Sequence, residues 1–274
     1  MDKYDNIEDF MRYIKLPQEA AKKILDYQMT EAEYKSWKNL FWIDRTNFFE
    51  KLEGAKDTKF KTLYLYIRFG IEMKPVFLEN GISEQIYYDT FYDLTIWCKW
   101  YKKYYGEYGM TEAKWYERLF ELKVFRLGRL EFEKIVLDKD IRYSKGIIKA
   151  GEKAIGVHVP EGNRLLEKEC DRSFQMAENF FSEEYKIYTC ASWLISPALE
   201  ELLDGESNIL KFKSRFEILD ITYEFPLAEQ RVFGIVKENK SEYPENTRLQ
   251  RKMKEFYLQG RKVGIAFGVK ERSV

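Results

Sequence analysis

The pattern of apolar and polar residues changes about half-way along the chain. In residues 1–122 the apolar positions recur three and four residues apart, which is the period of amphipathic helices. From about Arg126 onward the period shifts toward two and β-branched residues become more frequent, as is typical of strands. This change predicts a helical domain over residues 1–122 and a domain of strands and helices over residues 123–274.

Short signals mark several helix ends in the first half. Pro17 is placed where the first turn of a helix tolerates proline, and Thr30 with Glu33 forms the pattern of a capping box. Asn80 and Gly81 separate two long segments of helical period. We therefore expect a set of helices that includes two long ones.

The second long segment carries a stripe of aromatic residues on one side of a helix. Its members are three and four positions apart: Trp97, Trp100, Tyr101, Tyr104, Tyr105 and Tyr108. Such a stripe is typical of a core or a domain interface, so we expect Trp97, Trp100 and Tyr104 to be mostly buried. Two alternatives stay open. The stripe could form one wall of an apolar acyl pocket, or, if exposed, the surface of an adaptor for a protein or an apolar ligand.

The second half combines strand-like and helix-like segments. Three strand-like segments joined by short turns predict an antiparallel meander: 126–137, 141–150 and 153–160. The pattern then predicts a helix over 165–181 and a strand over 185–195. Beyond these it predicts a short helix opened by Ser196 and Pro197, strands over 208–224 and 231–237, a helix from the Thr247 and Gln250 capping box to Gly260, and a last strand over 262–269.

One turn in this half is a candidate binding site. In AIGVHVPEGNRLLEKECDRSF, at 154–174, a strand-like run with the only histidine, His158, ends in a proline and a glycine before a helix-like pattern. A helix N-terminus presents free backbone N–H groups and the positive end of the helix dipole, which suits a phosphate-bearing ligand. The candidate anion-binding residues are therefore Gly162, Asn163 and Arg164. The alternative is an ordinary strand-to-helix connection, which shows the same sequence pattern without binding an anion.

Composition and charge exclude several classes of function. Forty-six basic residues balance 46 acidic ones, so no global charge attracts nucleic acid or an anionic membrane surface. The acidic N-terminus and the lack of a long apolar stretch argue against secretion and membrane insertion. Cys98, Cys170 and Cys190 have neither metal-ligand spacing nor a disulfide framework. We therefore expect buried thiols, no metal and a cytoplasmic location. The oligomeric state stays open.

The predicted order of elements in the second half resembles the GNAT acyltransferase fold from its second strand onward. Longer segments resemble one bacterial family of acyltransferases that have a helical N-acyltransferase N-terminal domain and a GNAT-like C-terminal domain. These segments are FRLGRLEFE at 125–133, VHVPEG at 157–162, ASWLISPALEELL at 191–203, SNILKFKSRFEI at 207–218, RVFG at 231–234 and TRLQRKMKEFYLQGRKVGIAFGV at 247–269, with GISEQIYYDTFYDLTIWCKWY at 81–101 in the helical domain. The resemblance implies an α+β or α/β fold, in which a helical N-terminal domain precedes a GNAT-like mixed, mostly antiparallel sheet flanked by helices.

The resemblance also implies a function. GNAT enzymes transfer an acyl group from a coenzyme A thioester, here acetyl-CoA or another acyl-CoA, to an amine, here of a small molecule or a peptide. In that fold the turn after the third meander strand holds the coenzyme A pyrophosphate, and this turn corresponds to residues 160–165, with Gly162, Asn163 and Arg164. The alternative is a regulatory or adaptor protein that binds acyl-CoA or another ligand on the same scaffold without transfer chemistry.

The pyrophosphate loop of GNAT enzymes has its own pattern, which reads Gln or Arg, two residues, Gly, one residue, then Gly or Ala. The turn at 160–165 is shorter and has one glycine, whereas RKVGIA at 261–266 satisfies the pattern and RVFGIV at 231–236 nearly does. Both matches lie in strand-like runs with no helix after them, so the N–H groups that the motif exposes would be missing. We regard both as chance matches.

Acyl transfer to an amine needs a base for the amine proton and an acid for the departing thiolate. His158 is a candidate base because an imidazole titrates near neutral pH. The alternative is a partly buried histidine whose hydrogen bonds have a structural role only. Glu161 on the same turn is a rival base, or else a solvated carboxylate. Ser192 is a candidate proton donor or orienting group on the facing strand. Cys190 fits a core residue better than a nucleophile, because nothing nearby would activate its thiol.

Overall fold

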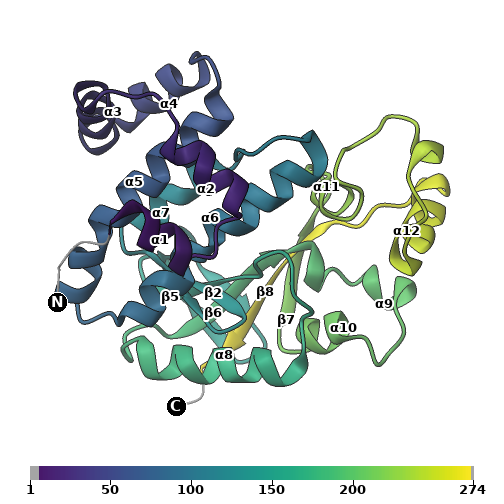
Figure 1. The fold of residues 1–274 in the computed structure, drawn as a ribbon. Helices are drawn as coiled ribbons and strands as arrows, with labels where there is room; N and C mark the ends of the chain where they lie inside the picture. Colours follow the sequence, from purple (N-terminus) through teal and green to yellow (C-terminus); the bar gives the residue numbers. More distant parts are fainter. Residues whose placement is uncertain (1–5, 273–274) are drawn as a thin grey trace. The chain divides into compact units, whose positions relative to one another are not determined.

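The chain divides into two compact units in a computed structural model that describes residues 6–272 (Figure 1). The first unit contains the chain up to Arg126 together with Pro160–Gly162, and the second contains Leu127–Val159 and the chain from Asn163 onward. The first is helical, and the second holds a mixed, mostly antiparallel sheet with helices. The predicted fold class is therefore confirmed.

The helices of the first unit follow the signals in the sequence. They are α1 (Ile7–Tyr13), α2 (Gln18–Leu25), α3 (Glu31–Ile43), α4 (Arg45–Glu53), α5 (Thr58–Glu79), α6 (Glu84–Tyr105), the 3-10 helix η1 (Ala113–Tyr116) and α7 (Glu117–Phe120). The predicted capping box begins α3, since Thr30 and Glu33 each accept a hydrogen bond from the other's backbone N–H. Pro17 is the N-cap of α2, one position before its first helical residue.

Aromatic rings fill the core of the first unit. Phe41 of α3 is fully buried, and its ring centroid lies 4.9 Å from that of Phe69 and 5.3 Å from that of Phe120. The rings of Phe48 and Tyr66 also pack against it, at 5.0 and 6.0 Å. These contacts join α3, α4, α5 and α7, so the core depends on one ring that four helices share.

The predicted aromatic stripe is only partly buried. Trp100 is 5% exposed, Trp97 and Tyr104 are mostly buried with a smaller exposed part, and Tyr105 is exposed. The centroids of Trp97 and Trp100 lie 5.7 Å apart, and those of Trp100 and Tyr104 lie 4.9 Å apart. The stripe therefore packs along α6 with one edge open, and the prediction that Trp97, Trp100 and Tyr104 are mostly buried is confirmed.

A buried carboxylate joins α6 to the end of the first unit. Asp93 is 2% exposed, and the Tyr116 hydroxyl donates a hydrogen bond of 3.0 Å to its Oδ2. Burial raises the pKa of Asp93 to about 6, while the hydrogen bond from Tyr116 and the positive charge of Arg126 act in the opposite direction. The proton of Asp93 is thus held more tightly in the folded chain than in the unfolded one.

This raised pKa predicts a pH-dependent contribution to stability. The folded pKa of about 6 exceeds the ordinary value of 3.8, so the stability that Asp93 contributes is lost as the pH rises through 6 and is complete only below 3.8. Relative to Asp93→Asn, we expect the free energy of unfolding of the wild type to gain about 2.5 kcal/mol between pH 7.5 and pH 4. Urea unfolding of both proteins, followed by tryptophan fluorescence, measures this difference. Parallel pH profiles would contradict the prediction.

The sheet has six strands in the order β1-β2-β5-β6-β8-β7. Its strands are β1 (Val124–Leu127), β2 (Leu130–Val136), β5 (Lys153–His158), β6 (Ile187–Ser192), β7 (Glu217–Thr222) and β8 (Ile265–Glu271). β5 and β6 run parallel, whereas the pairs β2–β5, β6–β8 and β7–β8 are antiparallel. The helices are α8 (Glu167–Phe180), α9 (Leu199–Leu202), α10 (Asn208–Lys213), α11 (Leu227–Phe233) and α12 (Arg248–Leu258), with the 3-10 helices η2 (Trp193–Ile195) and η3 (Lys240–Glu242).

The predicted meander is wrong in its first two segments. Segment 126–137 is divided between β1 and β2 by a turn at Gly128 and Arg129, where Gly128 has a left-handed φ of 71°. Segment 141–150 forms a separate hairpin, β3 (Ile141–Tyr143) and β4 (Gly146–Ile148), so β2 pairs directly with β5. The apolar residues of the hairpin pack into a small buried cluster, which explains their period without a place in the main sheet.

Two other predicted strands, 208–224 and 231–237, are partly helical. Residues 208–213 form α10, which begins where Ser207 Oγ accepts a hydrogen bond from the Ile209 N–H, and the strand starts only at Glu217. Residues 231–233 are the end of α11, so the near match RVFGIV begins in a helix. The predicted strand 185–195 ends at Ser192, and η2 follows. In short segments, the burial of a few apolar residues decides between helix and strand.

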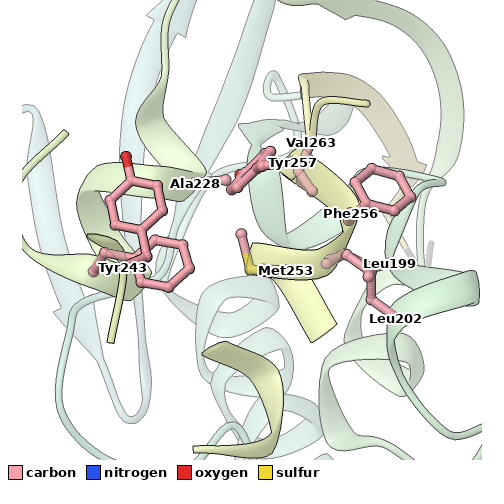
Figure 2. Close-up of a cluster of buried hydrophobic side chains, with 9 residues drawn as sticks. Leu199, Leu202, Ala228, Tyr243, Met253, Phe256, Tyr257 and Val263 are labelled. Atoms are coloured by element: carbon pink, nitrogen blue, oxygen red, sulfur yellow. The ribbon is translucent and has the colours of Figure 1, made fainter. Parts of the chain in front are cut away.

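Two cores hold the second unit together. On one face of the sheet, the rings of Phe132 and Tyr188 pack against Phe174 of α8, with centroids 5.7 and 5.1 Å away. The second core lies among α9, α11 and α12, where Met253 is central (Figure 2). There the rings of Phe233 and Tyr243 stack 3.9 Å apart. The predicted capping box of Thr247 and Gln250 begins α12 and is confirmed.

Candidate active site

The two parallel strands diverge at the centre of the sheet. Their pairing consists of Ile155 with Tyr188 and Gly156 with Thr189. Beyond these positions β5 continues along β2 as far as His158, while β6 continues along β8 as far as Ser192. The ladder between β5 and β6 therefore ends before the last residues of both strands, and we call the place where their pairing ends the notch. Backbone groups on the two sides of such a notch are available to a ligand rather than to the other strand.

His158 lies at the end of β5 beside this notch. Its Nε2 is 2.8 Å from Glu133 Oε2 of the neighbouring strand β2. The His158 side chain is 31% exposed, whereas that of Glu133 is 13% exposed. The carboxylate of the pair is therefore less exposed than the ring, which is the arrangement expected of an accessible base held by a partly buried carboxylate.

The turn after β5 is supported by an arginine from the β1–β2 turn. Arg129 is nearly buried; its Nη2 donates to the Asn163 carbonyl at 2.7 Å and its Nε to the Arg164 carbonyl at 3.2 Å. In a trans peptide, the C=O and the following N–H point in opposite directions. The N–H groups of Arg164 and Leu165 therefore point away from Arg129.

The same arginine residue is tied to α8. Its backbone N–H donates to Ser173 Oγ at 2.8 Å, and that hydroxyl donates to the Glu169 carbonyl at 2.9 Å. A Cβ at Gly128 would lie 2.8 Å from Ser173 Oγ, so only glycine allows the turn to sit this close to the helix. The β1–β2 turn and the first part of α8 thus form one support for the candidate loop.

The candidate anion site itself has the features that a phosphate needs. Gly162 is exposed with a φ of 112°, and no heavy atom lies within 4 Å of the position of a Cβ there. Asn163 and Arg164 are exposed, and the N-cap of α8, Leu166, forms no side-chain capping bond. Because no side chain caps α8, its first N–H groups remain available to an anion. The residues present therefore fit a pyrophosphate.

The other candidate residues have different surroundings. Glu161 is half-buried in the segment before Gly162. Ser192 Oγ accepts a hydrogen bond of 3.2 Å from the Leu194 N–H and caps η2. Alternation along β5 and β6 places Ser192 on the face of Tyr188 and His158 on the opposite face, so the structure does not bring these two side chains together. The roles assigned to Glu161 and Ser192 stay predictions.

Cys190 belongs to the core. It is 1% exposed, and burial raises the pKa of its thiol to about 12. A thiol with this pKa remains protonated at neutral pH and is a poor nucleophile. Cys98 and Cys170 are also buried and free, so the expectation of three core thiols is confirmed.

Three residues near the site escaped sequence reasoning. The pairing of β2 with β5 brings Glu133 and Gly156 next to His158. The turn between β1 and β2 brings Arg129 to the 160–165 turn. The one local signal was the Gly128-Arg129 pair, a turn pattern inside the segment predicted as one strand.

Among residues 6–272, no group of three or more metal-binding side chains is suited to hold an ion, and no helix has the length and apolar character to cross a membrane.

Comparisons with known proteins show the family and the fold. Residues 124–270 match the family model of a GNAT-like C-terminal domain, and residues 5–122 match that of an N-acyltransferase N-terminal domain. No curated protein matches the chain. Among solved structures, an acyltransferase in complex with decanoyl-CoA and teicoplanin is similar, with a TM-score of 0.78, 21% identity, and coverage of 97% of this chain and 88% of that one. An acyltransferase in complex with CoA and 10C-teicoplanin gives the same TM-score and identity, covering 98% and 88%.

Proposed function

The chain belongs to the family of the GNAT-like C-terminal domain, and we propose that it is an acyl-CoA-dependent N-acyltransferase. The observation that carries this proposal is the combination of the notch between β5 and β6 with the open turn that follows β5. The first could receive a thioester, and the second could hold the pyrophosphate of its coenzyme A. In this proposal residues 123–274 carry the chemistry, and residues 1–122 form a separate helical domain.

The reaction requires one proton acceptor and one proton donor. The amine nitrogen attacks the thioester carbonyl carbon, a C–N bond forms, the C–S bond breaks, and the sulfur leaves as a thiolate that takes up a proton. In our proposal His158 accepts the amine proton, with Glu161 as the rival acceptor, and backbone N–H groups at the end of β5 polarise the carbonyl. Ser192 is kept as a proposed orienting residue on β6. The protonated base, or water, can then return a proton to sulfur.

The donor and the acceptor are proposed from the similar structures. Those proteins bind decanoyl-CoA, octanoyl-CoA or CoA, and two of the complexes contain teicoplanin or its 10C form. We propose acyl-CoA as the donor, with medium-chain thioesters to be tested beside acetyl-CoA, and an amine of a small molecule or a peptide as the acceptor. The three free, buried thiols suit the reducing cytoplasm.

The cofactor part of the proposal predicts the effect of a change at Gly162. A valine there would place a branched side chain on the turn and strain the left-handed backbone. We expect Gly162→Val to weaken decanoyl-CoA binding by about tenfold or more while the fold persists. Isothermal titration measures the affinity, and circular dichroism checks the fold.

Gly151→Val is the matched control for this change. Gly151 also has a left-handed φ, of 87°, and no heavy atom within 4 Å of a Cβ position, but it lies in the turn before β5. It should suffer the same local strain and keep the affinity of the wild type. Equal affinities of the two folded variants would remove the pyrophosphate site from the 160–165 turn.

A non-catalytic acyl-CoA-binding protein on the same scaffold is the second candidate. It is favoured by the single glycine of the candidate loop, where working GNAT enzymes have a longer glycine-containing pattern. A thermal-shift screen with CoA, acetyl-CoA, octanoyl-CoA and decanoyl-CoA tests both candidates for binding, because a ligand that binds only the native state raises its stability. Release of free CoA thiol in the presence of amines then distinguishes transfer from binding alone.

A further inference from the structure

His158 is oriented by a residue that lies far from it in the sequence. We infer that Glu133 is the positioning residue for His158, and that the missing side chain of Gly156 allows the two to meet. This inference deepens the proposed function and rests on it, because it takes His158 as the group that accepts the amine proton. It adds Glu133 as the residue that determines the tautomer of the ring, and Gly156 as the residue that leaves room for this contact.

The register of β2 and β5 brings the pair together. Glu131 stands opposite His158, and Glu133 stands opposite Gly156, so Glu133 and His158 are diagonal neighbours on one face of the sheet. Diagonal side chains are about 7–8 Å apart at their bases, which only long side chains can bridge. Glutamate and histidine do so here, with Nε2 and Oε2 2.8 Å apart.

Gly156 leaves the space between these two side chains. A Cβ at this position would lie 3.4 Å from His158 Nε2, 3.4 Å from Glu133 Cβ and 3.7 Å from Glu133 Oε2. A methyl group would thus touch both partners, and any larger side chain would place further atoms between them. Gly156 does not have a left-handed φ, so the backbone does not require glycine. We therefore attribute the glycine at position 156 to the contact between His158 and Glu133, which needs this space.

The contact determines where the ring carries its proton. A carboxylate only accepts hydrogen bonds, so Nε2 carries the hydrogen and the lone pair of the neutral ring is on Nδ1. When the ring accepts the amine proton, the negative charge of Glu133 stabilises the resulting imidazolium. Of the other titratable groups on the neighbouring strands, Glu131 is opposite His158, while Tyr188 and Cys190 of β6 belong to the other face.

The single histidine makes a direct test possible. In a uniformly ¹⁵N-labelled sample, a long-range ¹H–¹⁵N correlation spectrum has imidazole signals from His158 alone. At pH 8.5, about two units above the ordinary pKa of an imidazole, we expect ¹⁵N shifts that show the hydrogen mainly on Nε2. In Glu133→Leu and in Gly156→Val, we expect shifts of a mixed pair of tautomers. This measurement needs no substrate, so it is independent of whether the protein is an enzyme.

Activity provides the second measurement. With decanoyl-CoA as the donor and a panel of primary amines as acceptors, we expect Glu133→Leu and Gly156→Val to lower kcat about tenfold to a hundredfold. We expect the KM for decanoyl-CoA and the melting temperature to change little. Glu133→Gln, which keeps an acceptor oxygen, should have an intermediate kcat. Glu183→Leu makes the same change at an exposed position and should match the wild type.

The outcomes separate this inference from the proposed function. Wild-type ring shifts and kcat in folded Glu133→Leu would overturn it, as would a wild-type ring tautomer in Gly156→Val. If Glu133→Leu does not fold, Gly156→Val decides, because it keeps both partners and a strand-forming side chain. If the tautomer shifts as expected but no donor is turned over by the wild type, the pair is real and the proposed function fails.

Discussion

Replacement of His158 by alanine is expected to lower kcat by about a hundredfold to ten-thousandfold, the usual effect of losing a general base. His158 lies at the end of β5 beside the notch, with its ring partly exposed and hydrogen-bonded to Glu133. The alanine removes the proton acceptor but no part of the 160–165 turn. The assay is release of CoA thiol from decanoyl-CoA with an amine that the wild type acylates.

Glu161→Gln is assayed separately, because Glu161 is the rival base on the same turn. The affinity for decanoyl-CoA should be that of the wild type in both variants, which distinguishes a loss of chemistry from a loss of binding. Full turnover in His158→Ala together with a large loss in Glu161→Gln would transfer the role of base to the glutamate. Full turnover in both would place the base elsewhere.

Phe41→Ala is expected to have the largest effect on stability. The ring is fully buried and packs against rings from α4, α5 and α7, so its removal leaves a cavity that rigid neighbours cannot fill. Such replacements cost about 3–5 kcal/mol of the free energy of unfolding, and a domain of ordinary stability has only about 5–15 kcal/mol in all. Urea unfolding followed by circular dichroism measures the loss.

Ile43→Ala is the control for this change, because Ile43 ends the same helix and is 83% exposed. It should alter the free energy of unfolding by less than about 0.5 kcal/mol. If Phe41→Ala cost no more than this control, the aromatic core would not be the main source of stability of the first unit.

The local features of the fold could be predicted from the sequence. Both capping boxes, the break at Asn80 and Gly81, and the strand, turn and helix around Gly162 are each encoded within a few neighbouring residues. The fold class followed from the change of period and from the family resemblance. Caps and turns depend on residues that are close together in the sequence, so they form in the same way whatever the order of the strands is.

Pairing between distant segments could not be predicted in the same way. The predicted meander has segment 141–150 between segments 126–137 and 153–160, and this order would separate Glu133 from His158 by one strand. In the structure the β3–β4 hairpin leaves the sheet, and the two side chains, 25 positions apart, become neighbours. The order of strands in a sheet depends on which apolar faces bury each other. Alternation of apolar and polar residues identifies a strand but does not determine which strands are its neighbours.

The position of β8 has a consequence for how the protein is made. This strand is last in sequence among the described residues, yet it lies between β6 and β7 and pairs with both. During synthesis the aromatic helical unit is complete long before β8 leaves the ribosome, whereas β7 has no neighbour in the sheet until then. The nascent second unit therefore has an open sheet edge until β8 is synthesised, and unpaired strand edges favour aggregation.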